Sequence, residues 1–365
     1  MIWLPDSYES IYRRAQQLIL IEDYEGAIGE YRRVFKRLAS LQPSLLERRP
    51  ALRNFFLDAG MKLTQLLREE GEYEEAIQVK ELLIEKDPDN RDRWRREIGE
   101  LLIERGDVEG GLKFLRDLAE EEPSDALNWI FLGQRCAGLE RFEESLAYLQ
   151  KGIQATKRKR ERGLGWLSVA DLQRRAGRYD EAAEAWERAA EGDPQQAGGV
   201  AWIYLMFIEA GQYPKARQYL AREENKFLSN FYAGWISWLQ GNRAGARRVW
   251  RLVAGWEPGK NFPEQECWAE ACLRIGQAEK VPPVLEPFLA ENPATPKILL
   301  LLAAARAALG DVEAARAPLG EIQRRLERAR ARETRIGPEE WRLFDAVVED
   351  EAIKSELAEY FAKEE

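Results

Sequence analysis

The stretch GRYDEAAEAWERAAEGDP, from Gly177 to Pro194, decides how the rest of the sequence is interpreted. It starts with a turn-forming glycine, ends with a proline that stops a helix, and alternates apolar and charged residues in between. Two further stretches have the same layout: GEYEEAIQVKELLIEKDP (71–88) and GDVEGGLKFLRDLAEEEP (106–123). The chain is therefore expected to be built largely from copies of one structural unit.

Weaker copies lie between and beyond these three stretches. The turn residue is expected at nine places, which are separated by 30 to 37 residues except for one step of 49: Glu22, Gly71, Gly106, Glu140, Gly177, Gly211, Gly241, Gly276 and Gly310. A period near 34 residues is typical of a repeat that consists of two antiparallel helices joined by a turn.

The residues around each turn support this register. Seven residues before the turn, seven of the nine copies have Gly or Ala, which allows two helices to approach closely. Nine residues after the turn, eight copies have Leu, Tyr or Trp, a large side chain that can fill the space between helices, and only Lys80 departs from this pattern. The agreement at positions outside the turn indicates true repeats.

Two further features recur. An aromatic residue follows the turn by two positions at Tyr24, Tyr73, Phe142, Tyr179 and Tyr213, and a proline closes the copy at Pro88, Pro123, Pro194, Pro258 and Pro293. Over about residues 8–330 the pattern resembles the tetratricopeptide repeat (TPR) family. The resemblance implies an all-α, right-handed superhelical solenoid of about nine helix-turn-helix repeats. We expect the repeat array over residues 1–335, with an insertion at about 40–54 between the first and second repeats, and a C-terminal helical cap over 336–365.

Composition excludes several kinds of chemistry. The chain has 365 residues, no histidine and three cysteines, Cys136, Cys267 and Cys272, so histidine-based catalysis and histidine metal sites are ruled out. No phosphate-binding loop, nucleophile elbow or isolated carboxylate pair is present. We therefore expect no enzyme activity, no metal and no cofactor.

The sequence also predicts the location of the protein. Its first residues, MIWLPDSYES, lack the basic start and apolar core of a signal peptide. The longest apolar runs are far shorter than the roughly 20 residues that a membrane span needs. We expect a cytoplasmic protein that does not bind membranes.

The resemblance places the partner-binding surface on the first helix of each pair, which lines a concave groove. The residues six and three positions before each turn are expected to point into it, and we call these the inner-face positions. The candidate groove residues, to which Arg96 and Phe231 are added, are Gln65, Arg68, Arg96, Glu100, Gln134, Asp171, Arg174, Phe231, Trp235 and Trp238. Family members that clamp a C-terminal carboxylate use Lys and Asn at fixed places, but here the Asn place holds residues such as Asp171 and Trp235 and the Lys place Ile130 and Phe231. The clamp for chaperone tails is therefore not expected.

The densest aromatic stretch is FLSNFYAGWISWLQG (227–241), in which Phe231, Trp235 and Trp238 share one helix face. These rings either anchor a partner in the groove or fill the core beside a shortened helix. Sequence alone leaves both interpretations open.

Two basic runs are further candidates. The run KRKRER contains Lys157, Arg158, Lys159, Arg160 and Arg162, and RRLERARARETR covers 324–335. Such runs either bind phosphate or an acidic partner or form a solvated face with the interleaved glutamates. The net charge of −9 does not favour nucleic acid as a partner.

The leading functional expectation is a scaffold or adaptor that binds a peptide or a partner protein in the groove. One alternative is a regulatory subunit of a nucleic-acid-handling or enzymatic complex that uses the basic runs. Another is a structural element that assembles with copies of itself.

Overall fold

A computed structural model describes residues 7–21, 23–192, 199–328, 336 and 338–362. The chain divides into two compact units, residues 1–199 and 200–365, which are described separately. In both, the described residues are helical apart from turns and one isolated β-bridge between Ile336 and Phe361. The predicted all-α helical-repeat fold is confirmed.

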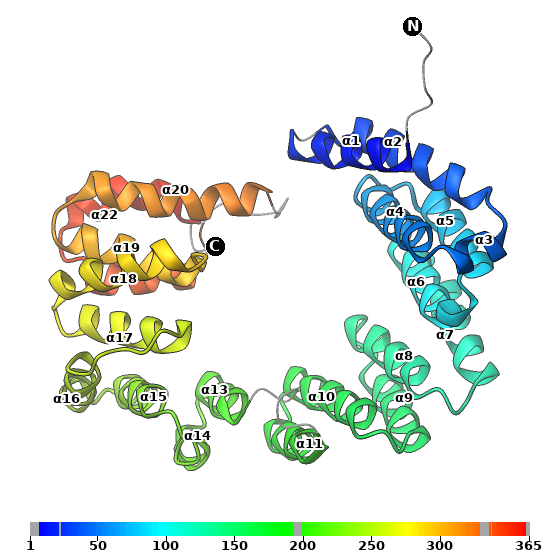
Figure 1. Ribbon diagram of the computed structural model, residues 1–365. Coiled ribbons are helices and arrows are strands. Elements are labelled where there is room, and N and C mark those ends of the chain that lie inside the picture. The colour runs from blue at the N-terminus through cyan, green and yellow to red at the C-terminus, as the bar shows by residue number, and fades with distance from the viewer. Residues whose placement is uncertain (1–6, 22, 193–198, 329–335, 337, 363–365) are drawn as a thin grey trace, which may run out of the picture. The chain divides into compact units, whose positions relative to one another are not determined.

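Unit 1 contains five antiparallel helical pairs that follow one another along the chain (Figure 1). Their bounds are α1 (Tyr8–Leu20) and α2 (Tyr24–Ala39), α4 (Pro50–Glu69) and α5 (Tyr73–Lys86), α6 (Arg91–Glu104) and α7 (Val108–Glu121), α8 (Ala126–Gly138) and α9 (Phe142–Ala155), and α10 (Lys159–Arg175) and α11 (Tyr179–Gly192). The 3₁₀ turn η1 (Pro88–Asn90) joins α5 to α6. Each pair packs on the next, so the buried face is continuous along the unit.

Unit 2 contains four further pairs and a C-terminal segment. The pairs are α13 (Ala201–Glu209) and α14 (Tyr213–Leu220), α15 (Lys226–Leu239) and α16 (Arg243–Ala254), α17 (Phe262–Arg274) with η2 (Ala278–Lys280) and α18 (Val281–Glu291), and α19 (Pro296–Ala308) and α20 (Val312–Arg328). The C-terminal segment contains α21 (Pro338–Val347), α22 (Glu351–Leu357) and η3 (Ala358–Tyr360).

The turn of each pair has the left-handed backbone conformation that glycine adopts without strain. Seven of the nine predicted turn residues are glycines with φ between 69° and 102°, and Glu140 takes the same role with φ 61°. Among the described residues, Glu140 is the one non-glycine with positive φ. The remaining predicted turn residue, Glu22, lies outside the described residues. The register inferred from the sequence is therefore confirmed at every turn that the structure describes.

The small residues seven positions before the turn lie directly beneath the large residues nine positions after it. In three pairs the contact is so close that a methyl group on the glycine would overlap the opposing side chain: Gly99 with Leu115, Gly133 with Leu149, and Gly234 with Trp250. These three large side chains are buried, so one close helix–helix contact holds each of the three pairs together.

Departures from the period have local causes. The insertion contains a short helix, α3 (Pro43–Arg48), followed by α4, which begins with Pro50 at its first position. The step of 30 residues coincides with the eight-residue helix α14. The insertion thus adds a short helix between the first two pairs, and the pair of α13 and α14 has a shortened second helix.

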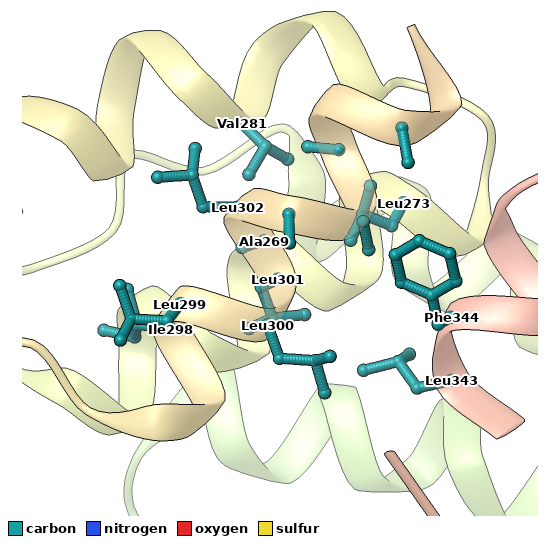
Figure 2. Packing of buried hydrophobic residues seen from close by; sticks show 14 of the residues in the cluster. Ala269, Leu273, Val281, Ile298, Leu299, Leu300, Leu301, Leu302, Leu343 and Phe344 are labelled. Atoms are coloured by element: carbon teal, nitrogen blue, oxygen red, sulfur yellow. The ribbon is translucent and has the colours of Figure 1, made fainter. Parts of the chain in front are cut away.

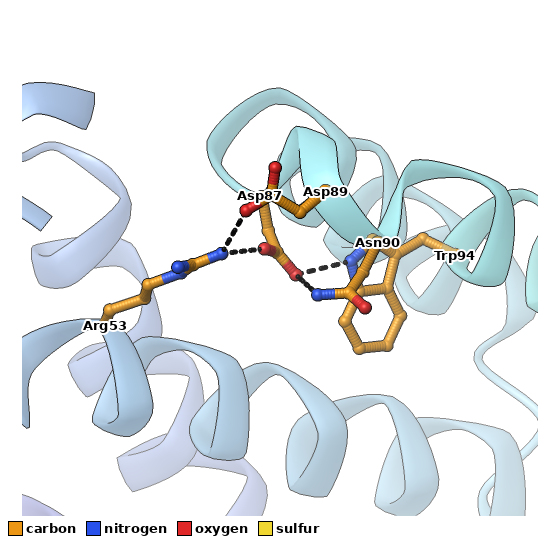
Figure 3. Close-up of polar contacts among 5 residues, drawn as sticks. All are labelled: Arg53, Asp87, Asp89, Asn90 and Trp94. Atoms are coloured by element: carbon orange, nitrogen blue, oxygen red, sulfur yellow. Dashed lines mark hydrogen bonds and ion pairs between the residues drawn. The ribbon is translucent and has the colours of Figure 1, made fainter. Parts of the chain in front are cut away.

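A buried carboxylate fixes the junction between α5 and α6 (Figure 3). Asp87 is fully buried and accepts hydrogen bonds from Arg53 Nη2 at 2.6 Å, Asn90 Nδ2 at 2.9 Å and the indole Nε1 of Trp94 at 3.1 Å. Burial raises the pKa of Asp87, but these donors outweigh burial and hold its pKa below the usual value. Asp87 therefore stays ionised and connects three helical elements.

Lys80, the exception to the large apolar pattern, is nevertheless buried. Its ammonium group lies 2.5 Å from a carboxylate oxygen of Glu97 and 4.7 Å from the ring centre of Trp94. Burial lowers the pKa of Lys80, and the opposite charge of Glu97 offsets only part of that effect. The aliphatic stem fills the space that Leu or Trp fills elsewhere.

Candidate functional site

The C-terminal helix α21 packs against α17 and α19, the first helices of the last two pairs. Figure 2 shows Leu343 and Phe344 extending from α21 toward Leu273 and Leu300, and all four are buried in one apolar cluster. The inner-face positions of these two pairs are buried as well: Glu270, Leu273, Ala304 and Ala307. The corresponding positions of unit 1 are mostly exposed or half-buried. In unit 2, by contrast, α21 covers the inner-face positions of the last two pairs.

The sequence of α19 already indicates that other elements cover this helix on every face. Its stretch from Ile298 to Ala305 is buried on all sides, and a helix that is apolar all round must have neighbours on every face. The sequence predicted a C-terminal helical cap but not that this cap folds back on the inner face.

Beside α21 lies a pocket of about 520 Å³. Its walls come from four helices, α15, α17, α19 and α21, through Trp235, Trp238, Leu239, Glu270, Arg274, Lys297, Leu300, Arg342, Leu343 and Ala346. We call it the tryptophan–arginine pocket. Trp235 and Trp238 occupy the inner-face positions of α15 and are half-buried, unlike the corresponding residues of the next two repeats.

Three of the residues that line the pocket form a charged cluster. Glu270 and Arg274 are one turn apart on α17, with Arg274 Nε 2.9 Å from Glu270 Oε1, and Lys297 Nζ lies 2.9 Å from Glu270 Oε2. Burial raises the pKa of Glu270, but the charges of Lys297 and Arg274 outweigh burial and lower its pKa below the usual value. Glu270 is therefore ionised and holds the two cations in place.

Arg274 also stacks on the aromatic cluster. Its guanidinium carbon lies 4.1 Å from the ring centre of Trp235 and 5.8 Å from that of Trp238. The two rings in turn contact Trp250 at 6.0 and 5.5 Å between ring centres. The guanidinium group and the indole rings thus form one packed cluster.

The aromatic stretch contributes both to the core and to the pocket. Phe231 is 3% exposed and packs against Trp250 and Ala246, so its placement among the candidate groove residues is wrong. It faces the second helix of its own pair because it lies one turn before Trp235, where the helices converge. Trp235 and Trp238 line the pocket. Sequence reasoning missed Arg274 and Lys297, which do not occupy inner-face positions.

The polar candidates of unit 1 bind residues of their own helix or of a neighbouring first helix. The contacts are Gln65 with Glu69 at 3.1 Å, Arg68 with Glu104, Arg96 with Asn128 at 2.6 Å, Glu100 with Arg135 at 2.6 Å, Gln134 with Ser168 at 2.8 Å, and Asp171 with Arg174 at 2.8 Å. Four of these contacts join successive first helices. They form a polar ladder that fixes the spacing of the repeats.

The residues of the first basic run also differ in whether they bind other residues of the chain. Arg158 binds Glu161 at 2.8 Å, whereas Lys157, Lys159 and Arg162 line a second hollow of about 700 Å³, together with Trp166 and Arg188. Arg160 is exposed. In the second run Arg324 and Arg325 both bind Glu321, and residues 329–335 lie outside the described residues.

The described residues contain no group of three or more Cys, Asp or Glu placed to hold a metal ion. Within the same residues, every helix is too short or too polar to span a lipid bilayer. The three cysteines are buried, and burial raises the pKa of each thiol, to about 11 for Cys136 and about 12 for Cys272.

The helical pairs, their glycine turns and their close contacts define a TPR-like helical-repeat protein. No family model and no curated protein matches the chain. Solved structures that it resembles include a tetratricopeptide repeat protein from Parabacteroides merdae (14% identity, 72% of this chain and 97% of that one, TM-score 0.37). Others are the C-terminal part of a TPR repeat-containing protein from Cytophaga hutchinsonii (14%, 70% and 98%, TM-score 0.41) and the APC/C hetero-tetramer Cut9-Hcn1 (15%, 94% and 76%, TM-score 0.36). With TM-scores this low, we infer nothing about partners from these likenesses.

Proposed function

We propose that this protein is a scaffold that binds a partner protein, and that the inner face of unit 2 is its main binding surface. One observation carries the proposal. The chain's own helix α21 lies on the inner-face positions of α17 and α19, while the equivalent residues of α15, Trp235 and Trp238, stay half-buried beside an open pocket. The surface thus accommodates an amphipathic helix and extends beyond it.

The chemistry of the pocket suits a protein ligand. Tryptophan and arginine are enriched among the residues that dominate binding energy at protein interfaces. Rings that are already packed lose little conformational entropy when a partner binds. A helix or extended segment that places an apolar side chain between Trp235 and Trp238 would bury their remaining exposed surface.

A photo-crosslinking pair tests this proposal in the native cell. Leu239 is exposed at the rim of the pocket, and Leu252 is similarly exposed on α16, the second helix of the same pair. A photoreactive phenylalanine at 239 should crosslink a protein identified by mass spectrometry, and the same residue at 252 should not. Trp235→Ala with Trp238→Ala should abolish the crosslink while the helical signal in circular dichroism persists.

Equal crosslinking from positions 239 and 252, or a crosslink insensitive to loss of both tryptophans, would contradict the proposal. A crosslink from position 239 to a second copy of this chain would instead favour the self-assembly alternative.

One observation favours a second candidate function, the binding of phosphate-bearing ligands. Lys157, Lys159 and Arg162 have no ion-pair partner among the described residues, and they converge on the hollow beside Trp166. Replacing all three by Ala should abolish salt-sensitive binding of short single-stranded RNA, if the hollow serves this purpose. Replacing Arg324 and Arg325, which are bound to Glu321, is the matched control and should leave that binding unchanged.

A further inference from the structure

Arg274 has hydrogen-bonding capacity that the protein does not use. Its side chain is only 5% exposed, and its Nε donates to Glu270. A guanidinium group has four more N–H donors, on its two terminal nitrogens. Within the described part of the chain these nitrogens have no acceptor, and Arg274 lines the tryptophan–arginine pocket. These terminal nitrogens are therefore available to an oxygen acceptor of a ligand that enters the pocket.

The charges around the pocket do not balance. Arg274 and Lys297 contribute two positive groups to its walls, against the single lining carboxylate of Glu270. Both oxygens of Glu270 are already engaged, one by Arg274 and one by Lys297. The lining of the pocket therefore offers no further carboxylate to the donors of Arg274.

We propose that the tryptophan–arginine pocket binds a carboxylate side chain, Asp or Glu, of the partner segment, next to an apolar side chain that packs on Trp235 and Trp238. This inference rests on the proposed function and names the chemistry of its partner. The planar guanidinium matches a carboxylate through two parallel hydrogen bonds. Lys297, which is 44% exposed, can supply an additional charge at the rim.

Two alternatives fit less well. A phosphate dianion would lie close to the ionised Glu270 and suffer twice the repulsion of a carboxylate. A free chain end would need the partner to terminate in the pocket, whereas α21 shows that this face holds a helix, and a helix presents its side chains. The cations also lie at other positions than those at which a chaperone-tail clamp would have Lys and Asn.

Three short peptides test the inference on the full-length chain. The probes are Ac-Leu-Glu-NH2, its neutral counterpart Ac-Leu-Gln-NH2, and Ac-Leu-Gln-OH, whose only carboxylate is its chain end. Binding is followed by NMR through the indole N–H signals of Trp235 and Trp238, assigned with Trp→Phe variants. The Glu peptide should shift both signals and bind about tenfold more tightly than the neutral peptide, because charge-assisted hydrogen bonds are the stronger ones.

Equal affinity for the Glu and Gln amides would overturn the inference. If Ac-Leu-Gln-OH bound as tightly as the Glu peptide, the assignment to an internal side chain would be overturned in favour of a chain end.

Paired substitutions show whether these charges cause the preference. Glu270→Gln with Arg274→Gln removes both members of the buried ion pair, and Lys297, the other partner of Glu270, is 44% exposed and keeps its charge in contact with solvent. The preference for Glu over Gln should fall from about tenfold to about onefold. The matched control is Glu286→Gln with Arg306→Gln, which removes an ion pair of the same unit outside the pocket and should keep the preference.

A preference that survived in the Glu270→Gln, Arg274→Gln variant would contradict the inference. If that variant does not fold, Arg274→Lys keeps the charge but lacks the planar pair of donors, and should lower the preference to about threefold or less. An unchanged preference in Arg274→Lys would equally contradict the inference.

The outcomes also separate this inference from the proposed function. A partner crosslinked at position 239 together with no Glu preference would refute the carboxylate assignment alone. A clear Glu preference without any partner crosslinked at 239 would refute the protein-scaffold proposal and leave a carboxylate-binding pocket.

Discussion

The indole ring of Trp250 lies directly on Gly234, so that a side chain of α16 contacts the backbone of α15. Its Nε1 donates a hydrogen bond of 3.1 Å to the carbonyl oxygen of Phe231, which fixes the orientation of the ring. Trp235 and Trp238 pack against this same ring, so the tryptophan–arginine pocket depends on the close contact beneath it.

Gly234→Ala should therefore destabilise unit 2. The added methyl group would overlap the indole of Trp250, and the cost of overpacking should exceed the gain in helix propensity and leave a loss of about 2 kcal/mol. Gly29→Ala is the control, since Gly29 lies in α2 with open space around it, and should stabilise by up to about 1 kcal/mol. Urea denaturation followed by circular dichroism measures both, and a neutral Gly234→Ala would contradict the close contact.

Glu140→Gly should stabilise unit 1. Glu140 adopts φ 61° at a turn where seven other repeats have glycine, and a non-glycine residue in this conformation costs about 1 kcal/mol. Replacement by glycine relieves this cost, so the urea midpoint should rise. Gly177→Ala, the reverse change at an equivalent turn with φ 73°, should lower the midpoint by a similar amount. A lower midpoint for Glu140→Gly would show that its side chain stabilises the turn in another way.

The turn at Glu140 illustrates what the sequence predicted well. Features that depend on residues close in the chain, such as turns, close contacts and helix ends, were predicted from spacing alone because the repeat supplies nine comparisons. The register even identified a glutamate in a glycine position. The inner-face positions of each first helix were predicted by the same means, and this identified Trp235 and Trp238 as candidate groove residues.

What could not be predicted depends on residues distant in sequence. Whether an inner-face residue is open or covered is decided by α21, which lies more than 60 residues beyond α17. Arg274 was not predicted as a site residue because its place in the pocket depends on contacts with Trp235 on α15 and, through Glu270, with Lys297 on α19. Spacing within one helix contains no information about such contacts.

Asp87→Asn should destabilise the α5–α6 junction at neutral pH by about 2 kcal/mol, the contribution of a hydrogen bond to a charged group. The folded-state pKa of Asp87 lies below its usual value of 3.8. Its stabilising contribution is therefore complete above that usual value and is lost as the pH falls through the folded-state pKa. The difference between wild type and Asp87→Asn should thus shrink below about pH 4, as measured by thermal melts at pH 7 and pH 3. A difference independent of pH would show that the charge of Asp87 does not contribute.

Lys80→Leu should stabilise unit 1 by about 1 kcal/mol at pH 7. Leucine is the kind of residue found at this position in the other repeats, and it avoids the cost of burying an ammonium group. Glu97 would keep Arg93 as a partner at 3.3 Å. Burial lowers the folded-state pKa of Lys80, so wild-type stability should rise as the pH increases from the folded-state pKa toward 10.5. The advantage of the variant should therefore shrink between pH 7 and pH 10, and an advantage that grew with pH would contradict this assignment.

Phe344→Ala should loosen α21 without unfolding the repeats beneath it. Phe344 is fully buried, and its truncation should cost about 3 kcal/mol of packing against α17 and α19. Hydrogen exchange of the amides in α21 should then accelerate by about 100-fold, whereas exchange in α15 and α16 should not change. Val347→Ala on the same helix removes part of a partly buried side chain and should have a smaller effect on exchange.

Because Arg342, Leu343 and Ala346 form one wall of the tryptophan–arginine pocket, Phe344→Ala should also weaken binding of Ac-Leu-Glu-NH2. Unchanged peptide affinity despite faster exchange of α21 would show that Trp235, Trp238 and Arg274 bind the peptide without that wall.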